Sequence, residues 1–187
     1  MSRLQVEATR LRGLMRVRRQ PLGDERGALT RVFCADELRD AGWSRPILQI
    51  NHTVTVRRGT VRGLHFQRPP HAEAKLVNCL RGEVWDIAVD LRSGSPTFLQ
   101  WHAERLSPGN GLALLIPEGF AHGFQTLTDE VEMLYCHSAA YVSTAEGGLH
   151  PQDPRLALPW PLPVAGLSSR DAAQPLIGDD FVEADLS

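Results

Sequence analysis

The stretch VWDIAVDL, Val84–Leu91, decides the fold class because its side chains alternate between two environments. Trp85 and every second residue after it are large and apolar, whereas the alternate positions include Asp86 and Asp90. Successive side chains of a strand point to opposite faces of a sheet. This period of two therefore predicts a β-strand whose two faces meet different surroundings.

The rest of the chain repeats this β-rich pattern. Turn residues, such as SPGNG at 107–111, separate further short apolar runs. We expect a hairpin between Gln125–Leu127 and Val131–His137. The other expected strands are Ile47–Val56, Val61–Phe66, Ala74–Leu80, Thr97–Leu106 and Leu112–Ile116. Many short strands at regular spacing predict an all-β sandwich or closed barrel.

Helical signals are scarce. The clearest is Asp36–Ala41, which Gly42 ends, and a second short helix is expected after Ser168. From about Gly147 the chain is rich in Pro, Gly and Leu and is expected to form an irregular C-terminal segment. Because no internal repeat is present, residues 1–187 are predicted to form a single domain.

Composition excludes several classes of partner. The net charge of −2 supplies no positive field for nucleic acid or a membrane surface. The Arg-rich N-terminus lacks the apolar core of a secretion signal, and no apolar stretch approaches a membrane span of about 20 residues. Cys34, Cys79 and Cys136 are odd in number and widely spaced, so we expect buried or semi-buried free thiols and a reducing, cytoplasmic location.

Several ionisable residues lie on the predicted strands, where a cavity wall would be. Each taken singly has a structural interpretation, such as a hydrogen-bonded core histidine or an ion pair between a carboxylate and a neighbouring arginine. Buried charges are costly unless they are paired or used, and these residues come from different strands that can converge on one cavity. The set consists of Arg62, His65, Lys75, Asp86, His122 and Tyr135.

The histidines raise the question of a metal. Small barrels of the cupin type often bind one through two closely placed histidines, a carboxylate and a further histidine. His65 and His122 stand in suitable contexts, but the position two after His65 is Gln67, and Glu73 lies beyond Pro69-Pro70. Two histidines and an amide make a poor site for iron, manganese or zinc. We therefore expect acid–base chemistry without a metal or other cofactor.

Ordered sequence blocks run from about Gly23 to Asp171. They are DERG at 24–27, QINH at 49–52, RGLHFQ at 62–67, KLV at 75–77, GEVWDIAVDLR at 82–92, GSPT at 94–97, IPEGFAHGF at 116–124 and DP at 153–154. In this order they resemble the dTDP-4-dehydrorhamnose 3,5-epimerase family and related mono-epimerases. The resemblance implies a cupin-type jelly-roll barrel, or double-stranded β-helix. It also implies an isomerase that inverts C3, C5 or both of a nucleotide-linked 4-keto-6-deoxyhexose.

The resemblance also implies roles for individual residues. His65 matches the family's base, Tyr135 its acid and Asp171 the carboxylate that orients the histidine, while Lys75, with Arg62, would lie beside the developing O4 oxyanion. The chemistry agrees, because a C–H next to a ketone is acidified by delocalisation of its anion as an enolate. A neutral imidazole with an ordinary pKa of roughly 6.5 can take that proton. Proton return from the opposite face inverts the centre.

Other positions match family residues that contact the nucleotide sugar. Tyr141 matches the aromatic residue that stacks on the base, and Arg26 matches an arginine that reaches over from the neighbouring subunit. A homodimer is therefore implied. The remaining matches are Gln49, Asn51, Arg62, Lys75, Asp86, His122, Glu146 and Arg170.

The chain departs from the family pattern at the nucleotide end. Arg31 stands where a glutamate usually reads the thymine edge, and a guanidinium can only donate hydrogen bonds. Ala28-Leu29, Ile50 and Ala139-Ala140 also differ from the usual residues. We therefore hypothesise a specialised substrate or another nucleotide. The alternatives to a full 3,5-epimerase are a mono-epimerase at C3 or C5, a non-catalytic sugar-nucleotide binding barrel, and a metal-dependent cupin oxygenase or isomerase.

Overall fold

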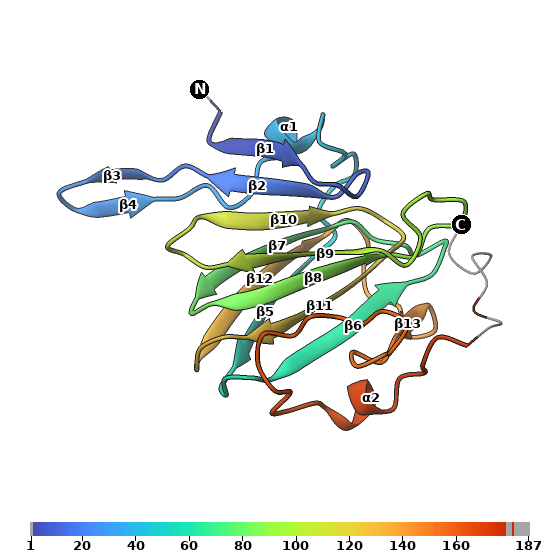
Figure 1. Cartoon of the computed structure of the whole chain (residues 1–187). Coiled ribbons are helices and arrows are strands. Elements are labelled where there is room, and N and C mark those ends of the chain that lie inside the picture. Colours follow the sequence, from blue (N-terminus) through green and yellow to red (C-terminus); the bar gives the residue numbers. More distant parts are fainter. Residues whose placement is uncertain (1, 179–180, 182–187) are drawn as a thin grey trace.

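The computed structural model describes residues 2–178 and residue 181, and antiparallel strands dominate this part of the chain (Figure 1). One sheet has the order β1 (Leu4–Ala8), β2 (Met15–Arg19), β10 (Leu112–Ile116), β7 (Lys75–Arg81), β12 (Val131–His137) and β5 (Gln49–Thr55). The other has the order β13 (Glu146–Gly148), β6 (Val61–Gln67), β11 (Phe120–Thr126), β8 (Val84–Asp90) and β9 (Trp101–Leu106). The remaining elements are a small hairpin of β3 (Leu22–Asp24) and β4 (Gly27–Leu29) and two short helices, α1 (Ala35–Leu38) and α2 (Ser169–Ala172).

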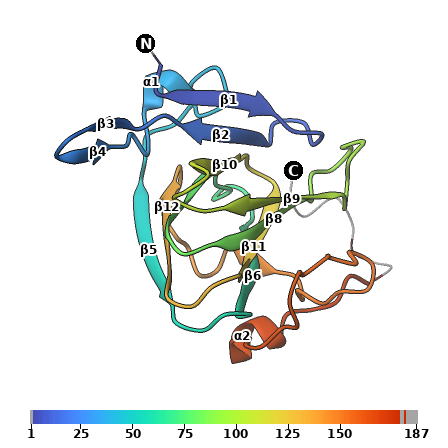
Figure 2. The same cartoon turned by 60° about the vertical axis from the view of Figure 1, so that its left-hand side comes forward.

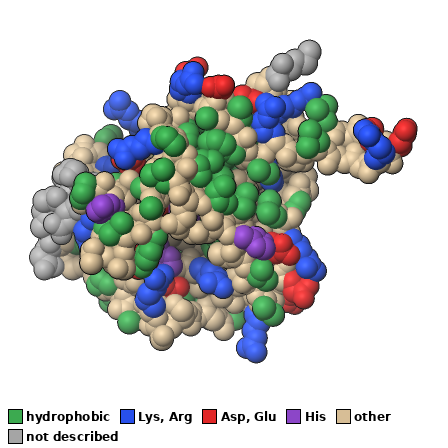
Figure 3. Space-filling view, turned by 180° about the vertical axis from the view of Figure 1, so that it is seen from behind, with side chains coloured by type: hydrophobic (Ala, Val, Ile, Leu, Met, Phe, Trp, Pro, Cys, Tyr) green, Lys and Arg blue, Asp and Glu red, His purple; other side chains and the backbone are tan. Residues whose placement is uncertain are grey.

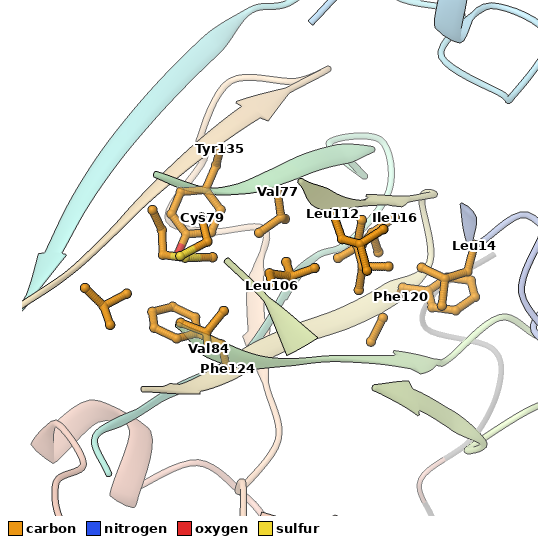
Figure 4. Close-up of a cluster of buried hydrophobic side chains, with 14 of the residues drawn as sticks. Leu14, Val77, Cys79, Val84, Leu106, Leu112, Ile116, Phe120, Phe124 and Tyr135 are labelled. Carbon is orange, nitrogen blue, oxygen red and sulfur yellow. The ribbon is translucent and has the colours of Figure 1, made fainter. Parts of the chain in front are cut away.

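The two large sheets face each other, and the chain passes repeatedly between them from β5 to β13 (Figures 1 and 2). Apolar side chains from both sheets meet in the space between them (Figure 4). Val77 and Met133 come from the first sheet, and Val84, Ala88 and Phe124 from the second. This arrangement confirms the expected all-β, jelly-roll architecture.

Strand β8 confirms the period of two. Val84 and Ala88 belong to the core between the sheets, whereas Ile87 and Val89 pack on the opposite face. That opposite face is not exposed, because Leu149, Leu156 and Ile177 of the C-terminal segment cover it. The irregular C-terminal segment is therefore a third layer, and it also carries α2.

The expected hairpin between 125–127 and 131–137 is wrong. β11 pairs with β6 and β8, whereas β12 pairs with β5 and β7, so the two strands belong to different sheets. The link between them packs on the β7–β8 turn, where the Glu83 N–H donates to the Thr128 hydroxyl at 3.1 Å. Both edges of each strand are occupied by partners distant in sequence, which local turn residues cannot reveal.

The other expected strands exist, with changed ends. Strand β9 begins at Trp101 rather than Thr97, because the Thr97 hydroxyl donates to Asp90 at 2.6 Å within the turn that precedes the strand. The helix expected after Ser168 is confirmed, and the Ser168 hydroxyl caps it by accepting from the Asp171 N–H at 3.0 Å. Strands β1 to β4 and β13 were not predicted. No helix in the described part of the chain is long and apolar enough to span a bilayer.

Close approach of β6 and β11 sets the position of two histidines. A Cβ on Gly63, whose φ is +116°, would lie 2.7 Å from the carbonyl oxygen of His122. A Cβ on Gly123 would lie 2.7 Å from a methyl of Leu64. The register shifts next to Gly123, and His65 pairs directly with His122 across the two strands. Glycine at both positions therefore brings these histidines together.

We predict that Gly123→Ala lowers the free energy of unfolding by about 1–3 kcal/mol, because the added methyl overpacks the β6–β11 contact. Urea denaturation followed by circular dichroism measures this change. Gly109→Ala is the matched control, because its nearest neighbour would be the Ser107 hydroxyl at 3.9 Å. Equal unfolding midpoints for the two variants would contradict the proposed close approach.

Candidate active site

A cavity of about 690 Å³ opens between the two sheets, within the size range of small-molecule sites. Strands of both sheets and α2 supply its walls. Seen from behind, the molecule is hollowed below a group of hydrophobic side chains, and basic, acidic and histidine side chains border the hollow (Figure 3). The cavity brings together Asn51, Arg62, His65, Lys75, His122, Tyr135, Tyr141, Glu146, Arg170 and Asp171, all of which the sequence had singled out.

His65 on β6 and Asp171 on α2 form a short hydrogen bond, with His65 Nε2 2.7 Å from Asp171 Oδ1. The other carboxylate oxygen accepts from the Gly63 N–H at 3.3 Å. Burial raises the pKa of Asp171, but the hydrogen bond and charge of His65, with the Gly63 N–H, outweigh burial and lower that pKa. The Arg170 guanidinium lies 3.2 Å from the same nitrogen, but the shorter contact with an ionised Asp171 favours the His65 tautomer protonated at Nε2, so Nδ1 keeps its lone pair.

His122 lies beside His65 and has its own carboxylate. Its Nε2 is 2.9 Å from Oδ2 of Asp86, which is fully buried on the adjacent strand β8. Burial raises the pKa of Asp86 against the opposing effects of His122 and Lys75. Asp86 does not line the cavity, although the sequence predicted a substrate contact there. The structure places Asp86 behind His122, where it orients the ring.

Tyr135 lies on β12, in the sheet opposite His65. Its ring contacts those of His122 and His137, with centroid separations of 6.0 and 6.1 Å. Burial raises the pKa of Tyr135 strongly, and Thr53 and Arg62 oppose this only in part. The hydroxyl therefore stays protonated at neutral pH and is available as a proton donor.

Lys75 on β7 occupies the same wall as Tyr135. Its ammonium is 3.0 Å from a carboxylate oxygen of Glu73 and 3.4 Å from the carbonyl oxygen of His65. Glu73 and His137 also line the cavity, and the sequence interpretation missed both as site residues. One signal was available: Lys75 is the only lysine in the chain, and Glu73 lies two residues before it, on the same side of an extended segment.

The mouth of the cavity holds a second polar group. Arg170 Nη1 is 3.0 Å from Glu146, and the Tyr141 hydroxyl donates to the same carboxylate at 2.9 Å. Gln49 lies behind this group and does not line the cavity. Its amide donates to Asn51 at 3.0 Å and accepts from the Tyr141 N–H at 2.9 Å. Gln49 therefore supports two residues of the wall.

Comparison with known proteins identifies the family of the chain. The family model for dTDP-4-dehydrorhamnose 3,5-epimerase matches residues 8–179. The chain belongs to this family of isomerases. A relative of that name from Shigella flexneri is 42% identical over 87% of this chain and 88% of its own length. The dTDP-4-dehydrorhamnose 3-epimerase of Streptomyces niveus is 39% identical over 86% and 78%.

A solved structure of a family member shares the fold. It is the dTDP-6-deoxy-D-glucose-3,5-epimerase of Legionella pneumophila in complex with dTDP-4-keto-L-rhamnose. The TM-score is 0.88 at 37% sequence identity, and the alignment covers 96% of this chain and 97% of that one. This similarity places the jelly-roll of the present chain among the epimerase structures of the family.

Gln67, the residue that interrupts the metal-binding pattern, holds loops in place. Its amide nitrogen donates to the carbonyl oxygens of His71 and Ala140 at 3.1 and 3.2 Å, and its oxygen accepts from the Val142 N–H at 2.7 Å. Every polar atom of the side chain is therefore used within the chain. Among the described residues, no three His, Cys, Asp or Glu side chains are grouped to hold a metal ion.

Arg26 and Arg31, which the family pattern places near the nucleotide, do not line the cavity of their own chain. Arg26 lies at the tip of the β3–β4 hairpin with its side chain 84% exposed. Arg31 forms an ion pair with Glu37, whose carboxylate also accepts from the N–H groups of Arg3 and Leu4. Within one epimerase chain, Arg31 therefore stabilises the N-terminal strand.

We predict that Asp171→Asn destabilises the protein by about 1–3 kcal/mol at neutral pH, because a buried charged hydrogen bond is lost. The folded-state pKa of Asp171 lies below its unfolded value of about 3.9. Its contribution is therefore present above pH 3.9 and is lost as the pH falls through the folded-state pKa. Urea unfolding of wild type and variant at a series of pH values measures the difference.

A double variant tests whether this effect belongs to the His65–Asp171 pair. In a cycle with His65→Gln, the two substitutions are expected to be non-additive, because each removes the same interaction. A difference between wild type and Asp171→Asn that is constant from pH 7 to pH 3 would contradict the assignment.

Proposed function

We propose that the protein is an epimerase that acts beside the 4-keto group of a nucleotide-linked 4-keto-6-deoxyhexose, with dTDP-4-dehydro-6-deoxy-D-glucose as its substrate and inversion at C3 and C5. One observation carries this proposal. A histidine–carboxylate pair and a protonated tyrosine lie on opposite walls of one cavity, and a lysine lies on the same wall as the tyrosine. This combination suits inversion of a carbon next to a ketone, because a base faces one side, an acid the other, and a positive group can bind the enolate oxygen.

His65 is the proposed base. Its Nδ1 lone pair takes the proton from the carbon next to the ketone, and the electron pair of the broken C–H bond moves onto the ketone oxygen as an enolate. The imidazolium that forms is stabilised by Asp171, 2.7 Å from its other nitrogen. This is the role that a carboxylate plays beside a catalytic histidine in general.

Lys75 is the proposed partner of the enolate oxygen. Its side chain is only 7% exposed, so its positive charge acts in a medium that screens it less than water does. Arg62 lines the same cavity, and its guanidinium is held by the Thr55 hydroxyl at 2.9 Å. Positive groups held in place beside the enolate oxygen stabilise the negative charge that develops there. They lower the barrier to proton removal because they need not move during the reaction.

Tyr135 is the proposed acid. It donates its hydroxyl proton to the opposite face of the enolate carbon, which re-forms the ketone and inverts the centre. His65 then carries an extra proton and Tyr135 lacks one. Exchange with solvent restores both groups, so each turnover at a carbon leaves a solvent-derived hydrogen there.

Glu146, Tyr141 and Arg170 at the mouth of the cavity are proposed to contact the nucleotide. Arg170 suits the diphosphate, and the half-exposed Tyr141 ring suits stacking on the base. The family pattern supports this placement. Asn51 and His122 are proposed to contact the sugar, because both line the cavity and both match family positions that contact the nucleotide sugar.

We also propose a homodimer in which Arg26 completes the site of the partner chain. The β3–β4 hairpin projects from the body of the molecule, with Arg26 near its tip (Figures 1 and 3). Its apolar residues Leu22 and Leu29 are 47% and 72% exposed, and Ile50 on the edge strand β5 is 57% exposed. Such exposed apolar groups favour a protein partner.

We further propose a cytoplasmic location, which the free thiols of the chain support.

A mono-epimerase is the second candidate function. The Streptomyces niveus relative is named as a 3-epimerase, so family members of similar identity include single inversions. Small changes in the tilt of the sugar against His65 and Tyr135 decide which carbons reach both groups. The full catalytic set argues against a binding barrel, and the use of Gln67 by two loops argues against a metal-dependent oxygenase or isomerase.

We predict that the protein incorporates solvent deuterium at C3 and C5 of dTDP-4-keto-6-deoxyglucose in deuterated water. His65→Ala is expected to abolish incorporation, and Tyr135→Phe to lower epimer formation at least about a hundredfold, because general acid–base groups contribute on this scale. NMR and mass spectrometry measure both. His150→Gln, outside the cavity, is the control.

The pattern of incorporation separates the candidate functions. One deuteron would identify a mono-epimerase and the carbon that it inverts. Absence of exchange by wild type with this and other 4-keto sugar nucleotides would overturn the proposed activity and favour a binding protein.

For the dimer, we predict that Arg26→Ala raises the KM about tenfold, because one charged hydrogen bond to the nucleotide sugar is lost. Sedimentation is expected to show a dimer for both wild type and variant. Arg12→Ala, another exposed arginine outside the hairpin, is the control. A monomeric wild type, or an unchanged KM in Arg26→Ala, would contradict the proposed shared site.

A further inference from the structure

A third carboxylate–histidine pair, Glu73–His137, lies in the cavity and has no part in the mechanism above. Glu73 Oε2 is 2.8 Å from Nδ1 of His137, and Glu73 Oε1 is 3.0 Å from the Lys75 ammonium. All three side chains are at most 10% exposed. One carboxylate therefore bridges a histidine and the only lysine of the chain.

Strand pairing explains why these groups meet. His137 on β12 lies directly opposite Lys75 on β7, and side chains at directly opposite positions on one face are close neighbours. Glu73 lies two residues before Lys75 and so points to the same side of the extended segment. The bridge is therefore built into the register of two central strands.

Hydrogen bonding fixes the state of this bridge. His137 donates from Nδ1 to Glu73, which leaves Nε2 as an acceptor 3.4 Å from the Asn51 amide nitrogen. Burial raises the pKa of Glu73, but the hydrogen bond from His137 and the charge of Lys75 outweigh it and lower that pKa. Glu73 therefore stays ionised at neutral pH and faces Lys75 with a full negative charge.

Removal of this charge would change what Lys75 can do. A buried ammonium without a counter-ion favours its neutral form, because burial penalises the charged form. The other carboxylate behind this part of the cavity, Asp86, is already bonded to His122 at 2.9 Å. A neighbouring carboxylate weakens the field of Lys75 on an oxyanion, but a neutral amine would supply no charge at all. Glu73 therefore favours the ammonium at the alkaline pH values where Lys75 would otherwise lose its proton, and its ion pair fixes the position of the ammonium.

We infer that Glu73, oriented by His137, is a positioning residue that holds the Lys75 ammonium charged and in place beside the enolate oxygen. The role of Lys75 at that oxygen rests on the proposed function, whereas the coupling between Glu73 and Lys75 does not. Glu73 and His137, which the family resemblance leaves without a role, would thus both act through Lys75.

A titration of Lys75 tests the coupling directly. Because the chain has one lysine, protein labelled with 13Cε-lysine gives a single side-chain resonance whose shift follows protonation. Glu73→Gln is expected to lower the midpoint of this titration by about one pH unit or more, the scale of an adjacent opposite charge. The other ionisable groups that line the cavity stay in place in this variant: Arg62, His65, His122, Tyr135, His137, Tyr141, Glu146, Arg170 and Asp171.

Two further variants separate this effect from a general loss of charge or fold. Glu83→Gln removes a carboxylate that pairs with Arg105 at 3.1 Å outside the cavity, and it is expected to leave the midpoint unchanged. His137→Gln keeps Glu73 but removes its imidazole donor, and is expected to give a smaller shift than Glu73→Gln. Near-ultraviolet circular dichroism checks that each variant is folded.

Kinetics test the consequence for the reaction. Glu73→Gln is expected to lower kcat about tenfold with little change in KM and to move the alkaline limb of the pH–rate profile to lower pH, because the variant loses the Lys75 charge earlier. Glu73→Asp, which keeps the charge, is expected to restore part of kcat. The expected pattern is a lowered midpoint together with this kinetic change.

The other possible results of the titration and the kinetics each decide one part of the proposal. An unchanged Lys75 midpoint in folded Glu73→Gln would overturn the inference, whatever the activity. A lowered midpoint with an unchanged pH–rate profile would overturn the positioning role. If wild type shows no deuterium exchange, the proposed function fails, and the titration still decides whether Glu73 is coupled to Lys75.

Discussion

The hydrogen bond between His65 and Asp171 is the interaction on which the site depends, because it joins the five-stranded sheet to the layer that covers it. Residues 106 positions apart meet at 2.7 Å. The bond sets the histidine tautomer, holds α2 against β6 and closes one side of the cavity. Gly63 contributes to the site in two ways. Its N–H donates a hydrogen bond to Asp171, and its lack of a side chain allows β11 to approach β6 closely.

The strands were largely predictable because a period of two appears wherever the two faces of a strand meet different surroundings. β8 shows this best, with one face in the central core and the other under the C-terminal segment. Strand partners were not predictable. The apolar runs that form β11 and β12 are separated by a turn that looks like a hairpin, yet the two strands lie in different sheets. Local sequence describes a strand's faces, whereas pairing depends on segments far away.

The site residues that match a family pattern could be predicted from the sequence, whereas those outside the pattern could not. His65 and Lys75 lie in recognisable blocks, Tyr135 follows from the family resemblance, and the structure brings all three to one cavity. Gln49 and Asp86 carry the same kind of signal but support the wall from behind. Glu73 and His137 were missed because each looks ordinary alone, and only the register of β7 against β12 makes them a pair.

The position of Asp171 late in the sequence has a consequence for the newly made chain. During synthesis, all the strands of both sheets leave the ribosome before Asp171 does. The two sheets can therefore pair and pack while the histidine still lacks its carboxylate. The site would therefore become complete only when the C-terminal segment has folded onto the second sheet, and not when the strands of the barrel have paired. A chain that ended before Asp171 would lack both this carboxylate and Ile177, which helps to cover the second sheet, so its site would stay incomplete.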